Sequence, residues 1–207
     1  MFGVLGISGW KIGIVVMSKK DRIKKYGNRY ERRDVAGNPN TPAETLAKLA
    51  TDEDREVRYA VAGNPSTQGD TLSKLATDED WLVRRAVAYN PSASGELLAR
   101  LASDEYSDVR RAVAWNPNTL AETLMVLMAD EEWHVRKEVA RNRSTPADAL
   151  NRLAEDEDLG VLLEVARNPK IPPEVINDLC FSEELSIRRV LSKNPAVPEH
   201  IRVGLSL

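Results

Sequence analysis

A five-residue motif recurs through most of this 207-residue chain, and each copy begins twenty-six positions after the last. It reads VAGNP at Val35 and Val61, VAYNP at Val87, VAWNP at Val113, VARNR at Val139, VARNP at Val165 and LSKNP at Leu191. Self-similarity at a fixed period is the signature of one structural unit stacked many times. The sequence therefore predicts an elongated repeat array rather than a domain folded around one core.

The first half of each repeat has a leucine pair three positions apart, as in Leu46 and Leu49, which predicts a helix with one buried edge. Thr41 and Glu44 have the spacing of a capping box, with Pro42 at the first helical position. Thr67, Thr119 and Thr145 repeat this arrangement.

The second half begins at an acidic corner, residues 52–54, whose charges suit a helix N-terminus. Val57, Ala60 and Val61 then form an apolar stripe with helical spacing. The Asn-Pro pair ends this helix, because proline disfavours the helical conformation before it and asparagine tolerates the left-handed one. No stretch has the alternation of a β-hairpin.

The asparagine of the motif persists in all seven copies, even where Arg143 replaces the proline. We therefore expect its side chain to bond backbone groups at the corner and to bridge neighbouring repeats. This structural set comprises Asn38, Asn64, Asn90, Asn116, Asn142, Asn168 and Asn194.

Together these patterns predict an all-α solenoid of 26-residue, two-helix repeats without a β-sheet. The solenoid is expected over residues 35–207, as about six full repeats and a partial seventh, and residues 1–34 are assigned to an apolar and then basic segment with a degenerate half repeat. The unit formed by residues 83–91 together with 41–54 resembles the leucine-rich repeat variant, a family of short helical repeats with a HEAT-like shape. The resemblance implies a right-handed superhelix, a second helix of α or 3₁₀ type, and a scaffold role.

Residues 1–17 are apolar apart from Lys11, and this stretch is shorter than a transmembrane helix requires. Met17-Ser-Lys-Lys has the form of a translation start, so residues 1–16 are interpreted as an upstream extension. A short apolar segment that covers the first repeat and a membrane anchor are the alternatives.

No catalytic, cofactor-binding or metal-binding residues are expected. Cys180 is the single cysteine, which excludes an intrachain disulfide, favours a reducing cytoplasmic setting, and argues against the iron-sulfur cluster that a founding family member carries in a cysteine-rich N-terminal segment. His134 and His200 lie in different repeats. The acidic corners lack the ligand spacing of a calcium loop, so they are interpreted as helix caps.

A column of basic residues follows the second helices: Arg58, Arg84, Arg85, Arg110, Arg111 and Arg136. Such a stripe is the basis of an alternative function, the binding of nucleic acid, with help from the basic N-terminal segment. Acids four positions earlier, such as Asp54 before Arg58, predict neutralising pairs within each helix. Residues 1–34 carry nine Lys/Arg against three Asp/Glu (+6), which leaves 20 against 29 (−9) for the array, and that negative balance disfavours phosphate binding.

The third letter of the motif and the start of the second helix vary freely between near-identical repeats. Positions that do not hold the stack together are expected to face outward. Aromatic residues gather there in the central repeats, namely Trp81, Tyr89, Tyr106, Trp115 and Trp133. Exposed aromatic patches typically mark interfaces, although each ring could instead pack on the adjacent repeat. The predicted function is therefore a non-enzymatic scaffold that binds a protein partner through these residues.

Overall fold

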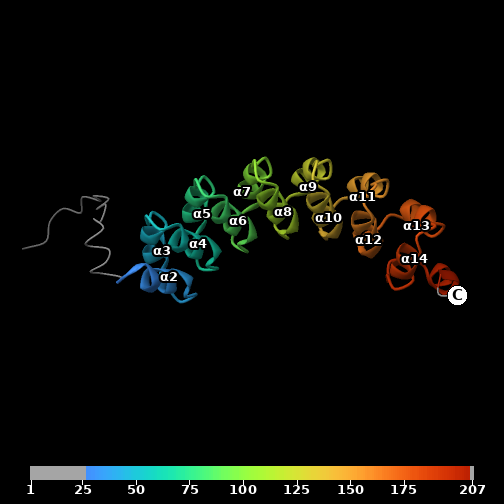
Figure 1. The fold of residues 1–207 in the computed structure, drawn as a ribbon. Coiled ribbons are helices and arrows are strands. Elements are labelled where there is room, and N and C mark those ends of the chain that lie inside the picture. The colour runs from blue at the N-terminus through green and yellow to red at the C-terminus, as the bar shows by residue number, and fades with distance from the viewer. Residues whose placement is uncertain (1–26, 206–207) are drawn as a thin grey trace, which may run out of the picture.

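The computed structural model describes residues 27–205, and every regular element in that range is an α-helix (Figure 1). Two helices alternate, an inner one that ends at the Asn-Pro corner and an outer one that follows it. The inner helices are α2 (Arg29–Gly37), α4 (Arg55–Gly63), α6 (Trp81–Tyr89), α8 (Ser107–Trp115), α10 (Trp133–Arg141), α12 (Leu159–Arg167) and α14 (Leu185–Leu191). The outer helices are α3 (Ala43–Leu49), α5 (Gly69–Leu75), α7 (Gly95–Leu101), α9 (Ala121–Leu127), α11 (Ala147–Leu153), α13 (Pro173–Leu179) and α15 (Glu199–Leu205). The predicted all-α solenoid is confirmed.

The apolar stripe of the inner helices forms the continuous core. Val57 and Val61 are completely buried, as is Ala62 beside them. The acidic corner begins the helix as predicted, because the Asp54 carboxylate accepts a hydrogen bond from the Glu56 N–H at 2.9 Å. Each inner helix packs along the inner helices before and after it.

The outer helices bury the predicted leucine pairs, but the predicted capping boxes are wrong. Pro42 is the N-cap of α3 and no side chain caps this helix. The Thr41 hydroxyl instead donates to the carbonyl of Val35, and Thr67 donates in the same way to Val61 at 2.6 Å. The carbonyls at the end of an inner helix need donors, and they take the threonine hydroxyl that would otherwise cap the outer helix.

The asparagines at the corners are extended, not left-handed. Asn64 has φ −73° and ψ 123°, as a residue before proline should, and among residues 27–205 a positive φ occurs at glycine alone. The Asn64 amide donates to the carbonyls of Ala36 at 2.7 Å and Asn38 at 2.8 Å, both in the preceding repeat. We call this repeated bridge the asparagine ladder, and it includes Asn64, Asn90, Asn116, Asn142, Asn168 and Asn194. In Asn38, the first copy, the side-chain oxygen accepts from the Asn40 N–H.

The array bends into an arc with the inner helices on its concave side and the outer helices on its convex side (Figure 1). Inner helices contact one another throughout, whereas outer helices mainly contact inner ones. Small alanines on the inner helices allow this close approach, which shortens the concave side relative to the convex side. The exposed sides of the inner helices therefore form one long concave face.

Among residues 27–205 the first helix of the stack is α2, which includes the boundary expected between residues 34 and 35. The interpretation of residues 1–16 as an upstream extension lies outside the described residues. Within residues 27–205, none of the helices has both the length and the apolar character needed to cross a bilayer.

Candidate interaction surface

Most of the predicted arginine column is occupied in holding the repeats together. Nε and Nη2 of Arg58 donate to the two carboxylate oxygens of Asp78 at 2.7 and 3.0 Å. The remaining terminal nitrogen of Arg58 donates to the carbonyls of Asp52 and Glu53 at 3.0 and 3.3 Å. One guanidinium thus joins two successive acidic corners. The predicted pairing of Arg58 with Asp54 in the same helix is wrong, because the carboxylate of Asp54 caps α4.

The same bidentate pair recurs at each of the first five junctions, always between an arginine and the aspartate that opens the next acidic corner. We call this set the arginine ladder; it comprises Arg32–Asp52, Arg58–Asp78, Arg84–Asp104, Arg110–Asp130 and Arg136–Asp156. The arginine side chains are 4 to 16% exposed, and their donors already have protein acceptors. This geometry leaves few N–H donors on Arg58, Arg84, Arg110 or Arg136 that could bind a phosphate.

The ladder also lowers the pKa of two of its aspartates, Asp130 and Asp156. Burial alone would raise the pKa of Asp130, but the hydrogen bonds from Arg110 and from the Glu132 N–H outweigh it and hold this pKa below its usual range. The pKa of Asp156 is lowered in the same way by Arg136 and the Asp158 N–H. The pKa of each ladder arginine is raised, mainly by the hydrogen bond to its aspartate. The pairs Arg110–Asp130 and Arg136–Asp156 are therefore ionised at neutral pH.

At the next junction, both partners change together. Leu162 replaces the arginine and Ser182 replaces the aspartate, so this junction has no ladder pair within the described residues. The Ser182 hydroxyl still accepts from the Glu184 N–H at 3.2 Å, which is the secondary role of the ladder aspartates. The constant separation of arginine and aspartate, and this joint replacement, were the sequence signals that would have revealed the ladder and added Arg32 to it.

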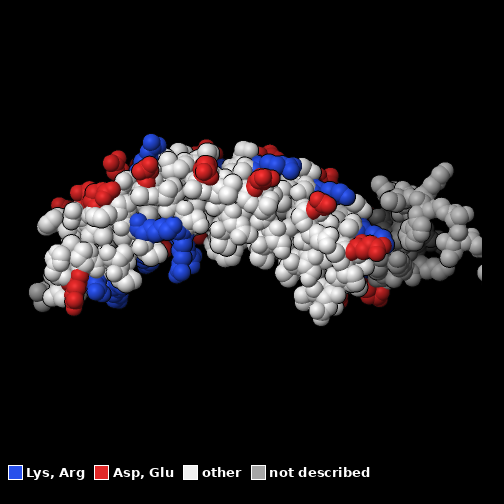
Figure 2. All heavy atoms as spheres, turned by 180° about the vertical axis from the view of Figure 1, so that it is seen from behind, with Lys and Arg blue, Asp and Glu red and all other residues white. Residues whose placement is uncertain are grey.

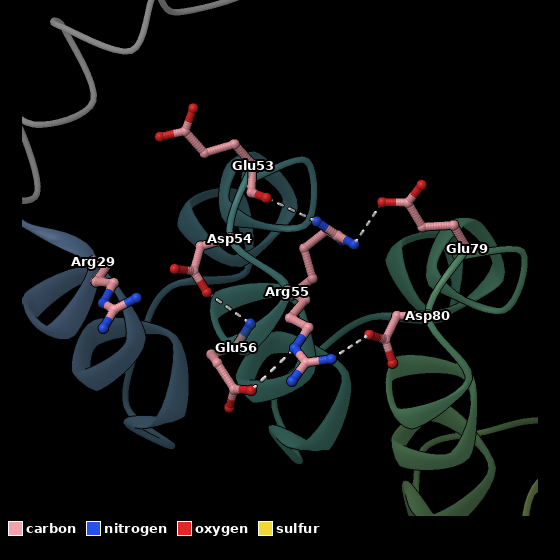
Figure 3. A pocket seen from close by; sticks show the side chains of 8 residues that line it. Arg29, Glu53, Asp54, Arg55, Glu56, Glu79 and Asp80 are labelled. Carbon is pink, nitrogen blue, oxygen red and sulfur yellow. Dashed lines mark hydrogen bonds and ion pairs between the residues drawn. The ribbon is translucent and has the colours of Figure 1, made fainter.

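The acidic corners face an open hollow of about 730 Å³ at the start of the array, and Figure 3 shows its lining. Three arginines there face five carboxylates, so ion pairs offset most but not all of the negative charge. Arg55 points toward Asp80 of the next repeat at 3.2 Å and lies 3.4 Å from Glu56 (Figure 3). Within residues 27–205 no group of three or more His, Cys, Asp or Glu side chains is arranged to hold a metal ion. The acidic corners thus cap helices and join repeats.

The predicted aromatic residues lie along two margins of the concave face. At the N-terminal ends of the inner helices, Trp81 stacks on Tyr106 with ring centroids 5.6 Å apart and planes 13° apart. At the C-terminal ends, Tyr89 meets Trp115 edge to face at 5.3 Å. An inner helix of nine residues rises about 12 Å from its first to its last residue, so the two margins are separated by roughly that distance. We call the five predicted residues, including Trp133, the aromatic surface.

The rings of the aromatic surface pack between repeats and also remain accessible. Tyr106, Trp115 and Trp133 are 43, 46 and 47% exposed. Trp81 and Tyr89 are half-buried against the neighbouring ring, so packing on the adjacent repeat, one of the two alternatives weighed from the sequence, holds for these two residues. A protein surface with several half-exposed aromatic side chains can bury a large apolar area against a partner.

Cations accompany the rings on the concave face. The guanidinium of Arg85 lies 5.0 Å from the centroid of Trp81, and the ammonium of Lys137 lies 5.7 Å from that of Trp133. Arg111 pairs with Asp108 in its own helix at 2.9 Å. Arg85 and Arg111, unlike the other predicted arginines, therefore lie outside the ladder.

Two comparisons with known proteins agree with this architecture. A model described as the leucine-rich repeat variant domain matches residues 31–85, and one described as the leucine-rich repeat variant matches residues 81–105 and 133–158. A solved structure titled a leucine-rich repeat variant with a novel repetitive protein structural motif is 29% identical, with a TM-score of 0.63 over 84% of this chain and 70% of that chain. The chain belongs to the leucine-rich repeat variant family.

As a leucine-rich repeat variant, the protein is a helical repeat scaffold. An engineered protein of known crystal structure is a more distant match, at 20% identity and a TM-score of 0.41 over 91% of this chain and 98% of its own. None of the curated proteins matches the chain. The functional surface of this leucine-rich repeat variant must therefore be inferred from its own residues.

Proposed function

We propose that this leucine-rich repeat variant protein binds a protein partner on its concave face, through the aromatic surface. The observation that carries the proposal is the set of half-exposed rings on α6, α8 and α10. Positions corresponding to Trp81, Tyr89, Trp115 and Trp133 hold glycine, arginine, lysine, serine or leucine in other repeats, and the position of Tyr106 holds aspartate or glutamate, so the rings are not needed for folding. Trp and Tyr are the residues most enriched among those that dominate binding energy at protein interfaces.

The arrangement of the rings supports a single contiguous contact. Trp81, Tyr106 and Trp133 form one margin, and Tyr89 with Trp115 forms the other. Edge-to-face and stacked packing fixes the rings before binding, which reduces the entropy lost when a partner immobilises them. The spacing of about 12 Å between margins accommodates one extended or helical segment.

The proposal is tested by purifying interacting proteins with the full chain as bait and comparing it with a variant carrying Trp115→Ala and Trp133→Ala. We expect recovery of a specific partner to fall at least about tenfold, because each lost ring removes a large desolvated contact. Circular dichroism of the variant should be unchanged.

The matched control carries Val126→Ala and Phe181→Ala, two apolar side chains that are 69 and 85% exposed but lie outside the aromatic surface. It should recover the partner as well as the original chain does. Equal recovery with all three baits would show that the aromatic surface is not the binding site.

Nucleic-acid binding is supported less by the geometry. Four of the six arginines proposed for it, Arg58, Arg84, Arg110 and Arg136, give their donors to aspartates and carbonyls. The faces of Trp81 and Tyr106 are also partly covered by each other and by nearby guanidinium groups, 5.0 Å from Trp81 and 5.5 Å from Tyr106, whereas base stacking needs open ring faces.

A further inference from the structure

The residue before the corner asparagine changes character along the array in a directional way; it is the last residue of α2 to α12, whereas α14 ends at Leu191. This position holds Tyr89 and Trp115 in α6 and α8, and then a basic residue in each of the next three repeats. We call those three, Arg141, Arg167 and Lys193, the basic edge. The inner helices run parallel because each repeat is a copy of the last, so these residues follow one another along the same margin of the concave face.

The basic edge is exposed and continues directly from the aromatic surface. Arg141 and Trp115 line the same open hollow, of about 290 Å³, at the ends of α8 and α10. The side chains of Arg141 and Arg167 are 61 and 53% exposed. Apolar contact area and positive charge therefore adjoin on one margin.

Positive charge increases toward the C-terminal repeats. Glu138 lies 3.9 Å from Arg141, and Glu164 lies 2.7 Å from Arg167, so these two cations each have one local carboxylate. Val190 stands three residues before Lys193, where Glu138 and Glu164 precede Arg141 and Arg167. No carboxylate in residues 27–205 lies within ion-pair distance of Lys193 or Arg189.

Arg189 and Lys193, the two cations without a nearby carboxylate, line the same hollow as Arg167 of the basic edge. This hollow is open, has a volume of about 400 Å³ and lies between the last two inner helices. Basic side chains gather toward the C-terminal end of the face in Figure 2, whose centre is largely uncharged. Negative charge on the convex side is interspersed with Lys and Arg along the upper edge of the same view.

We propose that the partner bound by the aromatic surface is a protein segment with an apolar part followed by an acidic part. This inference rests on the proposed function and adds the chemistry and direction of the partner. The apolar part lies on α6 and α8, and the acidic part lies along the basic edge from α10 to α14. Neighbouring helix axes lie about 8 to 10 Å apart, which matches about three residues of extended chain, so one carboxylate in every three can meet one cation of each repeat.

An acidic protein segment fits this margin better than a nucleic acid does. Glu138 and Glu164 alternate with the cations, and a continuous row of phosphates would be repelled by both. Separate carboxylates, one at every third position, can contact the cations and avoid those two acids. The edge-to-face contact between Tyr89 and Trp115 presents ring edges and apolar hollows rather than a stacking platform for bases.

The test uses a random 16-residue peptide library selected on the full chain, followed by fluorescence anisotropy of the enriched peptides. We expect enrichment of peptides in which aromatic or aliphatic residues adjoin several Asp or Glu residues. With Arg141→Glu, Arg167→Glu and Lys193→Glu together, their dissociation constant should rise at least about tenfold, because attraction is replaced by repulsion.

The matched control reverses three exposed cations on the convex outer helices, Lys74→Glu, Arg100→Glu and Arg152→Glu. It changes the net charge by the same amount and should alter affinity less than threefold. Replacing the basic edge with glutamine should give an intermediate loss, which separates charge from misfolding.

The outcomes separate the two proposals. Selected peptides without acidic enrichment, or an equal loss in both charge-reversal variants, would overturn this inference. If the peptides nevertheless lose affinity with Trp115→Ala, the proposed function stands and the acidic partner is rejected. If no acidic peptide is selected but a 20-nucleotide single strand binds and is lost with the basic-edge variant, the edge recognises nucleic acid and the inference is likewise wrong.

Discussion

One asparagine side chain at each corner satisfies backbone groups from two repeats. Asn116 is completely buried; its amide donates to Ala88 at 2.7 Å and Asn90 at 3.1 Å, and its oxygen accepts from the Asn118 N–H at 2.9 Å. Both carbonyls belong to the end of an inner helix, where intrahelical partners are lacking. A buried side chain with three hydrogen bonds is required wherever the chain turns from one repeat into the next.

Replacing Asn116 with alanine should lower the free energy of unfolding by about 2 to 4 kcal/mol, since it leaves two carbonyls and one N–H buried without partners. Urea denaturation followed by circular dichroism measures this change. Asn40→Ala, at an exposed corner position, serves as the control and should change stability by less than about 0.5 kcal/mol. A loss at Asn116 no larger than that of the control would show that the asparagine ladder is dispensable.

The bridging role of asparagine could be predicted because the residue persists where proline is lost, at Arg143. The conformation of the corner could not be predicted equally well. Both the left-handed and the extended state are open to asparagine, and the extended one occurs with a following proline, as at Asn64, and also without it, at Asn142, where the side chain makes the same bridge. The prediction that Thr41 caps the outer helix was wrong for a comparable reason. The Thr41 hydroxyl bonds the Val35 carbonyl, which is not part of the capping motif and was therefore not considered.

Between elements, the arginine ladder joins each acidic corner to the next. The prediction of pairs within one helix considered the nearest acid in the sequence, but Asp54 and Asp80 accept hydrogen bonds as helix caps instead. The true partner lies in the following repeat because neighbouring inner helices are parallel and in register. This is a property of the stack, and one repeat considered alone does not contain it. In the sequence, the pairing is indicated by the joint replacement of arginine by Leu162 and of aspartate by Ser182 at one junction.

The ladder pair Arg110–Asp130 should tolerate the loss of both partners better than the loss of one. Arg110→Leu alone leaves a buried carboxylate without its cation and should cost about 3 to 5 kcal/mol. Adding Asp130→Ser, which recreates the natural combination of Leu162 and Ser182, should recover more than half of that loss. Urea unfolding of the two single variants and the double variant measures the coupling energy.

A double variant that is as unstable as Arg110→Leu would contradict the equivalence of the two junction types. Arg111→Leu is the control, because Arg111 lies on the concave face outside the ladder. It should change stability by no more than about 1 kcal/mol, since its pair with Asp108 is partly exposed.

Across the whole molecule, the constant period of the Asn-Pro motif was enough to predict the solenoid. The residue pattern alone did not predict the curvature, which only the family resemblance implied, because curvature depends on how closely inner helices approach relative to outer ones. The variable positions were expected to face outward, and most of them do. That they share one concave face depends on the curvature of the array. Their order along that face, aromatic and then basic, gives the array a direction that a single repeat cannot have.

Because the central repeats make equivalent contacts, one of them can be removed without breaking either ladder. Deleting residues 92–117 joins Pro91 to Asn118, so Asn142 meets the carbonyls of Ala88 and Asn90, and Arg84 meets Asp130. Stability in such arrays is approximately a sum of repeat and interface contributions. The shortened chain should therefore keep its helicity per residue and a cooperative transition, with a free energy of unfolding lower by a few kcal/mol. Deleting only half a repeat, 92–104, removes α7 and places the inner-helix sequence of α8 where an outer helix belongs, so it should abolish cooperative unfolding. Circular dichroism at 222 nm during urea titration distinguishes these results, and equal damage from both deletions would show that the fold does not depend on the repeat register.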